Sequence, residues 1–185
     1  ECIYILESLL QESADLYGKK NKSTHQGISI YRSGRGVMAC ITPFFSSLYT
    51  SVFFTACSIL SGNCVIHKPS KYTPLIGQFI ADAWDHTPLP RGIYSLIQGP
   101  GSHVGTLLCK DPSINGILFA GSLQVAKAVQ RKTPPYKFSA IYIGGKSAAV
   151  VFDDCDFNTT TKTIMSSSFR ATGQRPYSIC RVIGS

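Results

Sequence analysis

Charged residues are scarce in this chain, and their scarcity raises the question of a membrane segment. They make up 15% of the 185 residues, and residues 37–66 contain none. An uncharged run of that length could span a bilayer. The run also contains Pro43, Gly62, Asn63 and many hydroxyl side chains, which favour a strand, a buried helix and a second strand joined by turns. We therefore expect no membrane-spanning segment.

Regular cysteine spacing is also absent. The seven cysteines are an odd number, no C-x-x-C pair occurs, and several lie in apolar runs where a free thiol acts as a small hydrophobe. This usage argues against a disulfide framework and favours a reducing, cytoplasmic compartment. The chain begins at Glu1 without a basic segment followed by an apolar one, so we expect no signal peptide and an internal piece of something longer.

The histidines show no metal-ligand pattern. His25, His86 and His103 have no ligand spacing with each other or with cysteine, and His67 lies in an apolar run typical of a structural position. Asp153, Asp154 and Asp156 read as a turn and a helix cap. We expect no metal site.

Positive charge exceeds negative charge, with a formal net charge of +8 and an isoelectric point of about 9.2. Such an excess is compatible with nucleic acid, a membrane surface or a phosphorylated cofactor as partner. The basic residues are scattered, which favours a solvated face. One tight cluster comprises Lys19, Lys20 and Lys22, and a looser set comprises Lys127, Arg131, Lys132 and Lys137.

Apolar runs of strand length alternate with helical segments, and the 44% hydrophobic content is sufficient for one sizeable core. Because the runs are continuously apolar, both faces of their sheet should be covered. The pattern predicts an α/β fold, with a parallel Rossmann-like sheet and helices on both faces. The expected strands are 28–31, 37–41, 64–68, 94–97, 116–120, 140–143 and 149–152; the main helices are 1–20, 46–60, 73–86, 122–131 and 156–171.

Two loops are placed to bind phosphate, because helix N-termini at the carboxyl ends of parallel strands attract anions. The first loop carries Gly99, Gly101 and Gly105 after a strand and before a helix. The second is Gly121-Ser122, where the Ser122 hydroxyl can donate to a phosphate. The alternative for Ser122 is a plain helix N-cap.

Several strings along the chain resemble the signature of the aldehyde dehydrogenase superfamily. Residues 142–147 (Y-I-G-G-K-S) stand where the family has E-L-G-G-K-S, and residues 169–176 (F-R-A-T-G-Q-R-P) where it has F-x-x-x-G-Q-x-C. Residues 43–45 (P-F-F) stand where the family has P-W-N. Residues 62–74 stand where it has G-N-x-V-x-x-K-P-S-E-x-T-P, and residues 117–122 where it has I-x-F-T-G-S. The blocks are collinear from about Gly36 onward. The residues Gly173-Gln174-Arg175 are most similar to the corresponding residues of the succinylglutamate semialdehyde dehydrogenases.

The resemblance implies a site for NAD or NADP, weakened or lost. Its cofactor-binding positions are Lys68, Ser70, Gly99, Gly121 and Ser122. Lys68 would hold the adenosine ribose, and Gly121 and Ser122 would lie under the pyrophosphate. Two further positions depart from the pattern. Lys71 replaces a ribose-binding Glu and could tolerate a 2′-phosphate, and Ala126 replaces a Gly and places close approach of its helix in doubt.

The resemblance also implies that the catalytic groups are missing. Pro176 replaces the nucleophilic Cys, Tyr142 the general base Glu, and Phe45 the oxyanion-binding Asn. Cys180 is a candidate for a displaced nucleophile, and its alternative is an ordinary strand cysteine. No residue of this chain is therefore expected to be catalytic.

The family pattern divides the chain into an NAD(P)-binding-type domain with an N-terminal helix, residues 1–145, and the start of a truncated catalytic domain, residues 146–185. The first hypothesis is a truncated and inactive relative of an NAD(P)-dependent aldehyde dehydrogenase whose ancestor oxidised an aldehyde such as succinylglutamate semialdehyde. The second is a non-catalytic nucleotide-binding regulatory or assembly module, and the third a basic nucleic-acid-binding protein. An exposed apolar patch would favour association, for example into a homo-oligomer.

Overall fold

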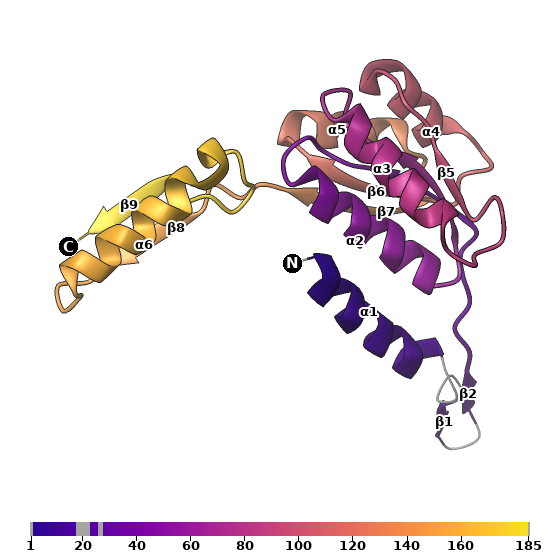
Figure 1. The fold of residues 1–185 in the computed structure, drawn as a ribbon, viewed down its shortest axis with the longest axis horizontal. Helices are drawn as coiled ribbons and strands as arrows, with labels where there is room; N and C mark the ends of the chain where they lie inside the picture. Colours follow the sequence, from indigo (N-terminus) through magenta and orange to yellow (C-terminus); the bar gives the residue numbers. More distant parts are fainter. Residues whose placement is uncertain (1, 18–22, 26–27, 185) are drawn as a thin grey trace.

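A five-stranded parallel sheet forms the body of the protein (Figure 1). The computed structural model describes residues 2–17, 23–25 and 28–184, so the lysine cluster at 19–22 lies outside the described residues. The strand order is β5-β4-β3-β6-β7. The strands are β3 (Val37–Ile41), β4 (Cys64–Lys68), β5 (Tyr94–Leu96), β6 (Gly116–Gly121) and β7 (Phe138–Ile143). The predicted α/β fold with a parallel sheet is confirmed.

Alternating side chains of the central strands point to two separate cores. Ala39 of β3 and Ile117 of β6 pack with Leu108 and Val129 on one face. Cys40 of β3 packs with Phe54 and other residues on the opposite face. The continuous apolar runs seen in the sequence are thus explained by burial on both sides.

Helices cover both faces. One face carries α2 (Ser47–Leu60), with α3 (Pro74–Asp85) beside α2 and β5, and the other carries α4 (Thr106–Lys110) and α5 (Leu123–Lys132). A π-helical turn, η1 (Gly101–Gly105), leads into α4. The N-terminal helix α1 (Cys2–Tyr17) packs along α2 (Figure 1). Residues 37–66 form β3, α2 and β4, and no helix in the described ranges is long and apolar enough to cross a membrane.

The C-terminal residues form an arm that extends away from the five-stranded sheet (Figure 1). It consists of β8 (Ala148–Val151), α6 (Phe157–Phe169), the short η2 (Arg170–Gly173) and β9 (Arg181–Gly184), with β8 and β9 paired in parallel. Helix α6 buries none of its residues, and its N-cap is Asp156, as expected. A second pair, β1 (Ser23–His25) and β2 (Ile28–Ile30), is antiparallel. The division at residue 145 stays a prediction.

One interpretation of a polar residue was wrong. Lys137 does not belong to a solvated face: it is 6% exposed, and its ammonium donates to the carbonyl oxygens of Cys109, at 3.0 Å, and Asp111. These carbonyls lie at the C-terminal end of α4, where a cation is favourable. Thr73 occupies the N-cap of α3, but its side chain makes no capping hydrogen bond, and its buried hydroxyl has no partner among the described residues.

Candidate functional site

The carboxyl ends of the five strands form one edge of the sheet. In the strand register Ile41 lies beside both Lys68 and Phe119, and Gly121 beside Ile143. The chain order reverses between β3 and β6, since β4 and β5 lie on one side of β3 and β6 and β7 on the other. Ligands of open parallel sheets bind at such a switch point, outside the carboxyl ends of the strands.

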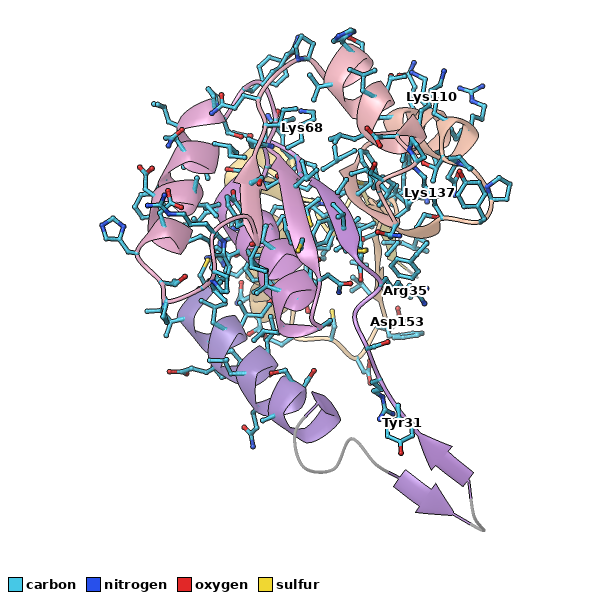
Figure 2. All side chains as sticks on the ribbon, turned by 90° about the vertical axis from the view of Figure 1, so that its right-hand side faces the viewer. Tyr31, Arg35, Lys68, Lys110, Lys137 and Asp153 are labelled. Carbon is cyan, nitrogen blue, oxygen red and sulfur yellow. The ribbon has the colours of Figure 1, made fainter. Side chains whose placement is uncertain are left out.

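Lys68 ends β4 at this edge and is labelled near the top of Figure 2, at the end of the sheet remote from the β1–β2 pair. The residue is 3% exposed, and burial lowers the pKa of its ammonium. That ammonium has three donors, and the described residues supply one acceptor, the Pro69 carbonyl oxygen at 2.7 Å. A Cβ added to Gly101 would lie 4.0 Å from Lys68 Cε. The side chain therefore runs beneath the glycine-containing loop after β5.

Ser70, Lys71 and Gly99 line one hollow of about 400 Å³ beside Lys68. The Ser70 hydroxyl accepts a hydrogen bond from the Tyr72 backbone N–H at 3.3 Å. Lys71 is exposed, with its ammonium 4.9 Å from the centre of the Tyr72 ring. The structure thus brings the adjacent residues Ser70 and Lys71 together with Gly99, which lies in a separate segment of the sequence.

Gly121 and Ser122 lie at the end of β6 and the start of α5. The Ser122 hydroxyl oxygen accepts from the Val125 N–H at 3.4 Å, so Ser122 is the N-cap of α5. The hydroxyl proton is not used in that bond and can still donate to an anion. Ala126 is 2% exposed within the core on this face, so its methyl group is accommodated and α5 still packs on β6.

An apolar slot of about 490 Å³ opens between α4 and α5, next to Ser122. Most of its lining is apolar, including Ile41, Phe119, Val125 and Val129, and Lys132 also lines it. The slot was not anticipated from the sequence. The apolar side chains of α5 recur at Val125 and Val129, four residues apart, but nothing in that spacing separates a slot from ordinary packing against α4.

The three expected catalytic positions meet in a different hollow, of about 450 Å³. Phe45, Tyr142 and Pro176 line it together with Ala120 of β6 and several residues of α2. Tyr142 packs against Phe54 of α2, with ring centroids 5.4 Å apart. We call this the aromatic pocket; its lining residues are Phe45, Ser46, Tyr49, Thr50, Phe53, Phe54, Ala120, Tyr142, Ile143, Gly145, Ser147, Pro176 and Tyr177.

Residues of α2 supply walls of the aromatic pocket that the sequence reading missed. Tyr49 and Phe53 stack with nearly parallel rings, 6.4 Å between centroids. Their spacing of four residues places both on one helix face, as does the spacing of Thr50 and Phe54. That pattern is present in the sequence, but it is equally typical of a buried helix.

Thiols near the aromatic pocket are poorly suited to nucleophilic attack. Cys180 is exposed, is not among the residues that line the pocket, and donates from its Sγ to the Ser178 carbonyl oxygen at 3.3 Å. Cys40 packs beneath Phe54, and burial raises the pKa of its thiol to about 12. Burial likewise raises the pKa of Cys57 to about 11. Thiolates, not thiols, are the nucleophiles.

His67 is fully buried between the strands and α2. Its Nε2 lies 3.0 Å from the Thr42 hydroxyl and its Nδ1 2.7 Å from the Tyr94 hydroxyl, while Thr42 also meets Ser51 at 2.9 Å. Burial, with the charge of Lys68 as the smaller cause, lowers the pKa of His67 to about 4. These contacts fit a structural position. In the described ranges no three His, Cys, Asp or Glu side chains are grouped closely enough to hold a metal ion.

Comparison with known proteins gives one consistent family. The model of the aldehyde dehydrogenase family matches residues 1–184. An N-succinylglutamate 5-semialdehyde dehydrogenase of Erwinia tasmaniensis is 34% identical over 149 residues, which is 80% of this chain and 30% of that protein. An alpha-ketoglutaric semialdehyde dehydrogenase of Bacillus subtilis is 31% identical over 149 residues, with the same two shares. The chain thus spans about 30% of the length of these curated relatives.

Solved structures agree on the fold. An NAD-dependent aldehyde dehydrogenase from Sinorhizobium meliloti superposes with a TM-score of 0.89 at 24% identity, covering 97% of this chain and 37% of that one. A glyceraldehyde-3-phosphate dehydrogenase from Methanocaldococcus jannaschii, complexed with NADP, gives a TM-score of 0.86 at 25% identity, covering 100% and 42%.

Proposed function

The chain belongs to the aldehyde dehydrogenase family, and we propose that it binds a dinucleotide, NADP in preference to NAD, without oxidising aldehydes. One observation carries the proposed absence of aldehyde oxidation. Phe45, Tyr142 and Pro176 line a single pocket to which the described residues contribute no thiol, carboxylate or imidazole.

The chemistry missing from the aromatic pocket is the chemistry that aldehyde oxidation needs. A nucleophile must attack the carbonyl carbon, a base must activate water, and donors must hold the developing oxyanion. Pro176 has neither a nucleophilic side chain nor a backbone N–H. Tyr142 offers a phenol where a carboxylate would serve as the base. Phe45 cannot donate a hydrogen bond.

The carboxyl edge of the sheet still fits a dinucleotide. The Lys68 ammonium has donors to spare, the N-terminus of α5 offers backbone N–H groups and the Ser122 hydroxyl proton, and the slot between α4 and α5 is apolar enough for a base. We assign the ribose to Lys68, the pyrophosphate to Gly121 and Ser122, and the adenine to the slot. The nicotinamide of a bound dinucleotide would be the hydride acceptor. Lys68, Gly121 and Ser122 would only bind and orient the dinucleotide.

Lys71 supports the preference for NADP. It lines the same hollow as Ser70 and Gly99, and its exposed ammonium would attract a 2′-phosphate. A carboxylate at this position would instead accept protons from ribose hydroxyls. Because Lys71 is exposed, salt should weaken the effect.

The relatives indicate the lineage. Two of them carry names of semialdehyde dehydrogenases, so we propose that the ancestral substrate was a semialdehyde such as succinylglutamate semialdehyde. All seven cysteines are unpaired, which supports a reducing compartment, and we propose the cytoplasm.

Binding without turnover would suit a regulatory or assembly module, and the geometry of Lys68 and Ser122 favours such a role over loss of all function. The test is calorimetric titration with NAD and NADP of the wild type, Lys68→Met and Lys162→Met. Lys162 is an exposed cation on α6. The expected result is binding that Lys68→Met weakens and Lys162→Met leaves unchanged. Absence of binding in the wild type would contradict the proposal.

A further inference from the structure

A hollow at the amino end of β5 lies away from the sites described above. It measures about 430 Å³, and we call it the Trp84 hollow; its lining residues are Trp84, Asp85, Leu89, Pro90, Arg91, Gly92 and Tyr94. Tyr94 begins β5 and pairs with Val65 near the start of β4, whereas Lys68 ends β4 at the carboxyl edge. None of these described residues also lines the aromatic pocket, the hollow beside Lys68 or the slot between α4 and α5.

Two aromatic rings form one wall of the Trp84 hollow. The rings of Trp84 and Tyr94 pack with centroids 6.1 Å apart and planes inclined by 28°. Tyr94 is held in place, because its hydroxyl lies 2.7 Å from the Nδ1 of buried His67 and its ring packs against the core that contains Cys40 and Phe54. A planar apolar group can add to the pair by offset or edge-to-face contact.

Asp85 and Arg91 place one negative and one positive charge in the same lining. Both side chains are exposed, and in the described part of the chain neither takes part in an ion pair. The carboxylate of Asp85 lies close enough to act on the aromatic wall: burial is the main cause that raises the pKa of Tyr94, and nearby negative charge, of which Asp85 is one source, adds to it. The two charges are therefore available to a ligand that stacks on the rings.

The loop that closes the Trp84 hollow is stiff. Pro88 and Pro90 flank Leu89, and Gly92 has a φ of 90°, a conformation that side chains rarely adopt. The Ile93 N–H donates to the Pro90 carbonyl oxygen at 3.3 Å and closes the turn before β5. Because proline fixes its own φ, this wall loses little conformational freedom when a ligand binds.

We propose that the Trp84 hollow binds a small zwitterion with a planar apolar group, of which an aromatic α-amino acid is the simplest example. The apolar group packs on Trp84 and Tyr94, the ammonium faces Asp85, and the carboxylate faces Arg91. The volume lies within the roughly 300–1,000 Å³ of small-molecule sites. Because both charged side chains are exposed, each contact contributes little, and the dissociation constant should be on the order of 1 mM. The site is independent of dinucleotide binding and of turnover.

Trp84 is the only tryptophan of the chain, so its fluorescence reports directly on the hollow. The experiment titrates the chain, without dinucleotide, with phenylalanine, with hydrocinnamate, which lacks the ammonium, and with phenethylamine, which lacks the carboxylate. Phenylalanine should change the emission along a saturating curve. Each of the other two ligands should bind about three- to fivefold more weakly at low salt, because it loses one exposed charge contact.

Matched variants assign the two charges. Asp85→Asn should remove the advantage of phenylalanine over hydrocinnamate, and Arg91→Gln its advantage over phenethylamine. The controls are Asp82→Asn, in the same helix, and Arg131→Gln, on α5; both residues are exposed and lie outside the lining. Both controls should keep both advantages, which a merely structural role of Asp85 or Arg91 would not predict.

Three results would overturn the inference: no saturating change with phenylalanine, equal binding of the three ligands, or persistence of either advantage in the variant that should lose it. Circular dichroism shows whether each variant is folded, and all of them keep the Trp84 reporter. The titration contains no dinucleotide, so its failure is distinguishable from failure of the cofactor titration.

Discussion

The backbone N–H of Gly145 donates a hydrogen bond to the carbonyl oxygen of Pro176 at 3.4 Å. This contact joins the Gly-Gly string after β7 to the loop that follows η2. The neighbouring Gly144 lies against the same loop, since a Cβ added to it would be 3.3 Å from both Pro176 Cα and Pro176 O. Two signature strings far apart in the sequence are thus held together by glycine backbone at one wall of the aromatic pocket.

Substitutions at these two glycines should differ. Gly144→Ala forces the Pro176 backbone to shift and should lower the free energy of unfolding by about 1 kcal/mol. Gly145→Ala adds a methyl group to open space and should change it by less than about 0.5 kcal/mol. Urea unfolding measures both, with hydrogen exchange of residues 174–184 as a local readout. Equal effects of the two variants would contradict the close contact.

Stability should fall in mild acid because of His67. Its pKa in the folded protein, about 4, lies below the ordinary value of 6.5, so the unfolded chain binds the proton more tightly. The stability that neutral His67 contributes is complete above pH 6.5 and is lost as the pH falls toward 4. Between pH 7.5 and 5 the loss should be roughly 2 kcal/mol.

The matched control is His67→Gln, which cannot titrate. Its free energy of unfolding is lower at neutral pH but should depend less on pH over the same range. Equal slopes for the two proteins in urea unfolding at several pH values would show that His67 is not responsible.

Lys137 should be far more sensitive than other lysines of its region. Lys137→Met removes the ammonium that binds the carbonyl groups of Cys109 and Asp111. The expected loss is roughly 1.5–3 kcal/mol in the free energy of unfolding. Lys127→Met, at an exposed position of α5, should cost less than about 0.5 kcal/mol. A similar small loss of unfolding free energy at both positions would indicate that Lys137 is solvated, as Lys127 is.

Cofactor preference should depend on Lys71. The wild type is expected to bind NADP roughly tenfold more tightly than NAD, and Lys71→Glu should reverse the preference. Added salt should shrink the difference, because the ammonium is exposed. Calorimetric titration with both dinucleotides at low and high salt measures this. Tighter binding of NAD by the wild type would refute the role assigned to Lys71.

Much of the fold followed from the sequence because its signals are local. Continuous apolar runs at 37–41, 64–68 and 116–120 became central strands, and Asp156 and Ser122 became helix caps. Strand β9 was missed because Arg181–Gly184 is short, begins with a charged residue and is exposed throughout. Its pairing with β8, some thirty residues earlier, is a non-local contact that no local pattern contains.

The candidate site was only partly predictable. Lys68, Gly121 and Ser122 could be placed at the carboxyl edge, because parallel strands end at one edge. The burial of Lys137 could not be foreseen, since nothing in its sequence neighbourhood distinguishes a solvated lysine from one that reaches a helix C-terminus. The aromatic pocket depends on rings from four segments, and only the folded chain brings these together.

The most direct test of the account is turnover itself. Purified protein with saturating NADP, and separately NAD, is mixed with semialdehydes of the kind named for its relatives and with benzaldehyde, and formation of reduced cofactor is followed. We expect no rate above the protein-free control, because nothing in the aromatic pocket replaces the nucleophile at Pro176. Turnover that is lost in Cys180→Ala and retained in Cys155→Ala would contradict the account and identify Cys180 as the nucleophile.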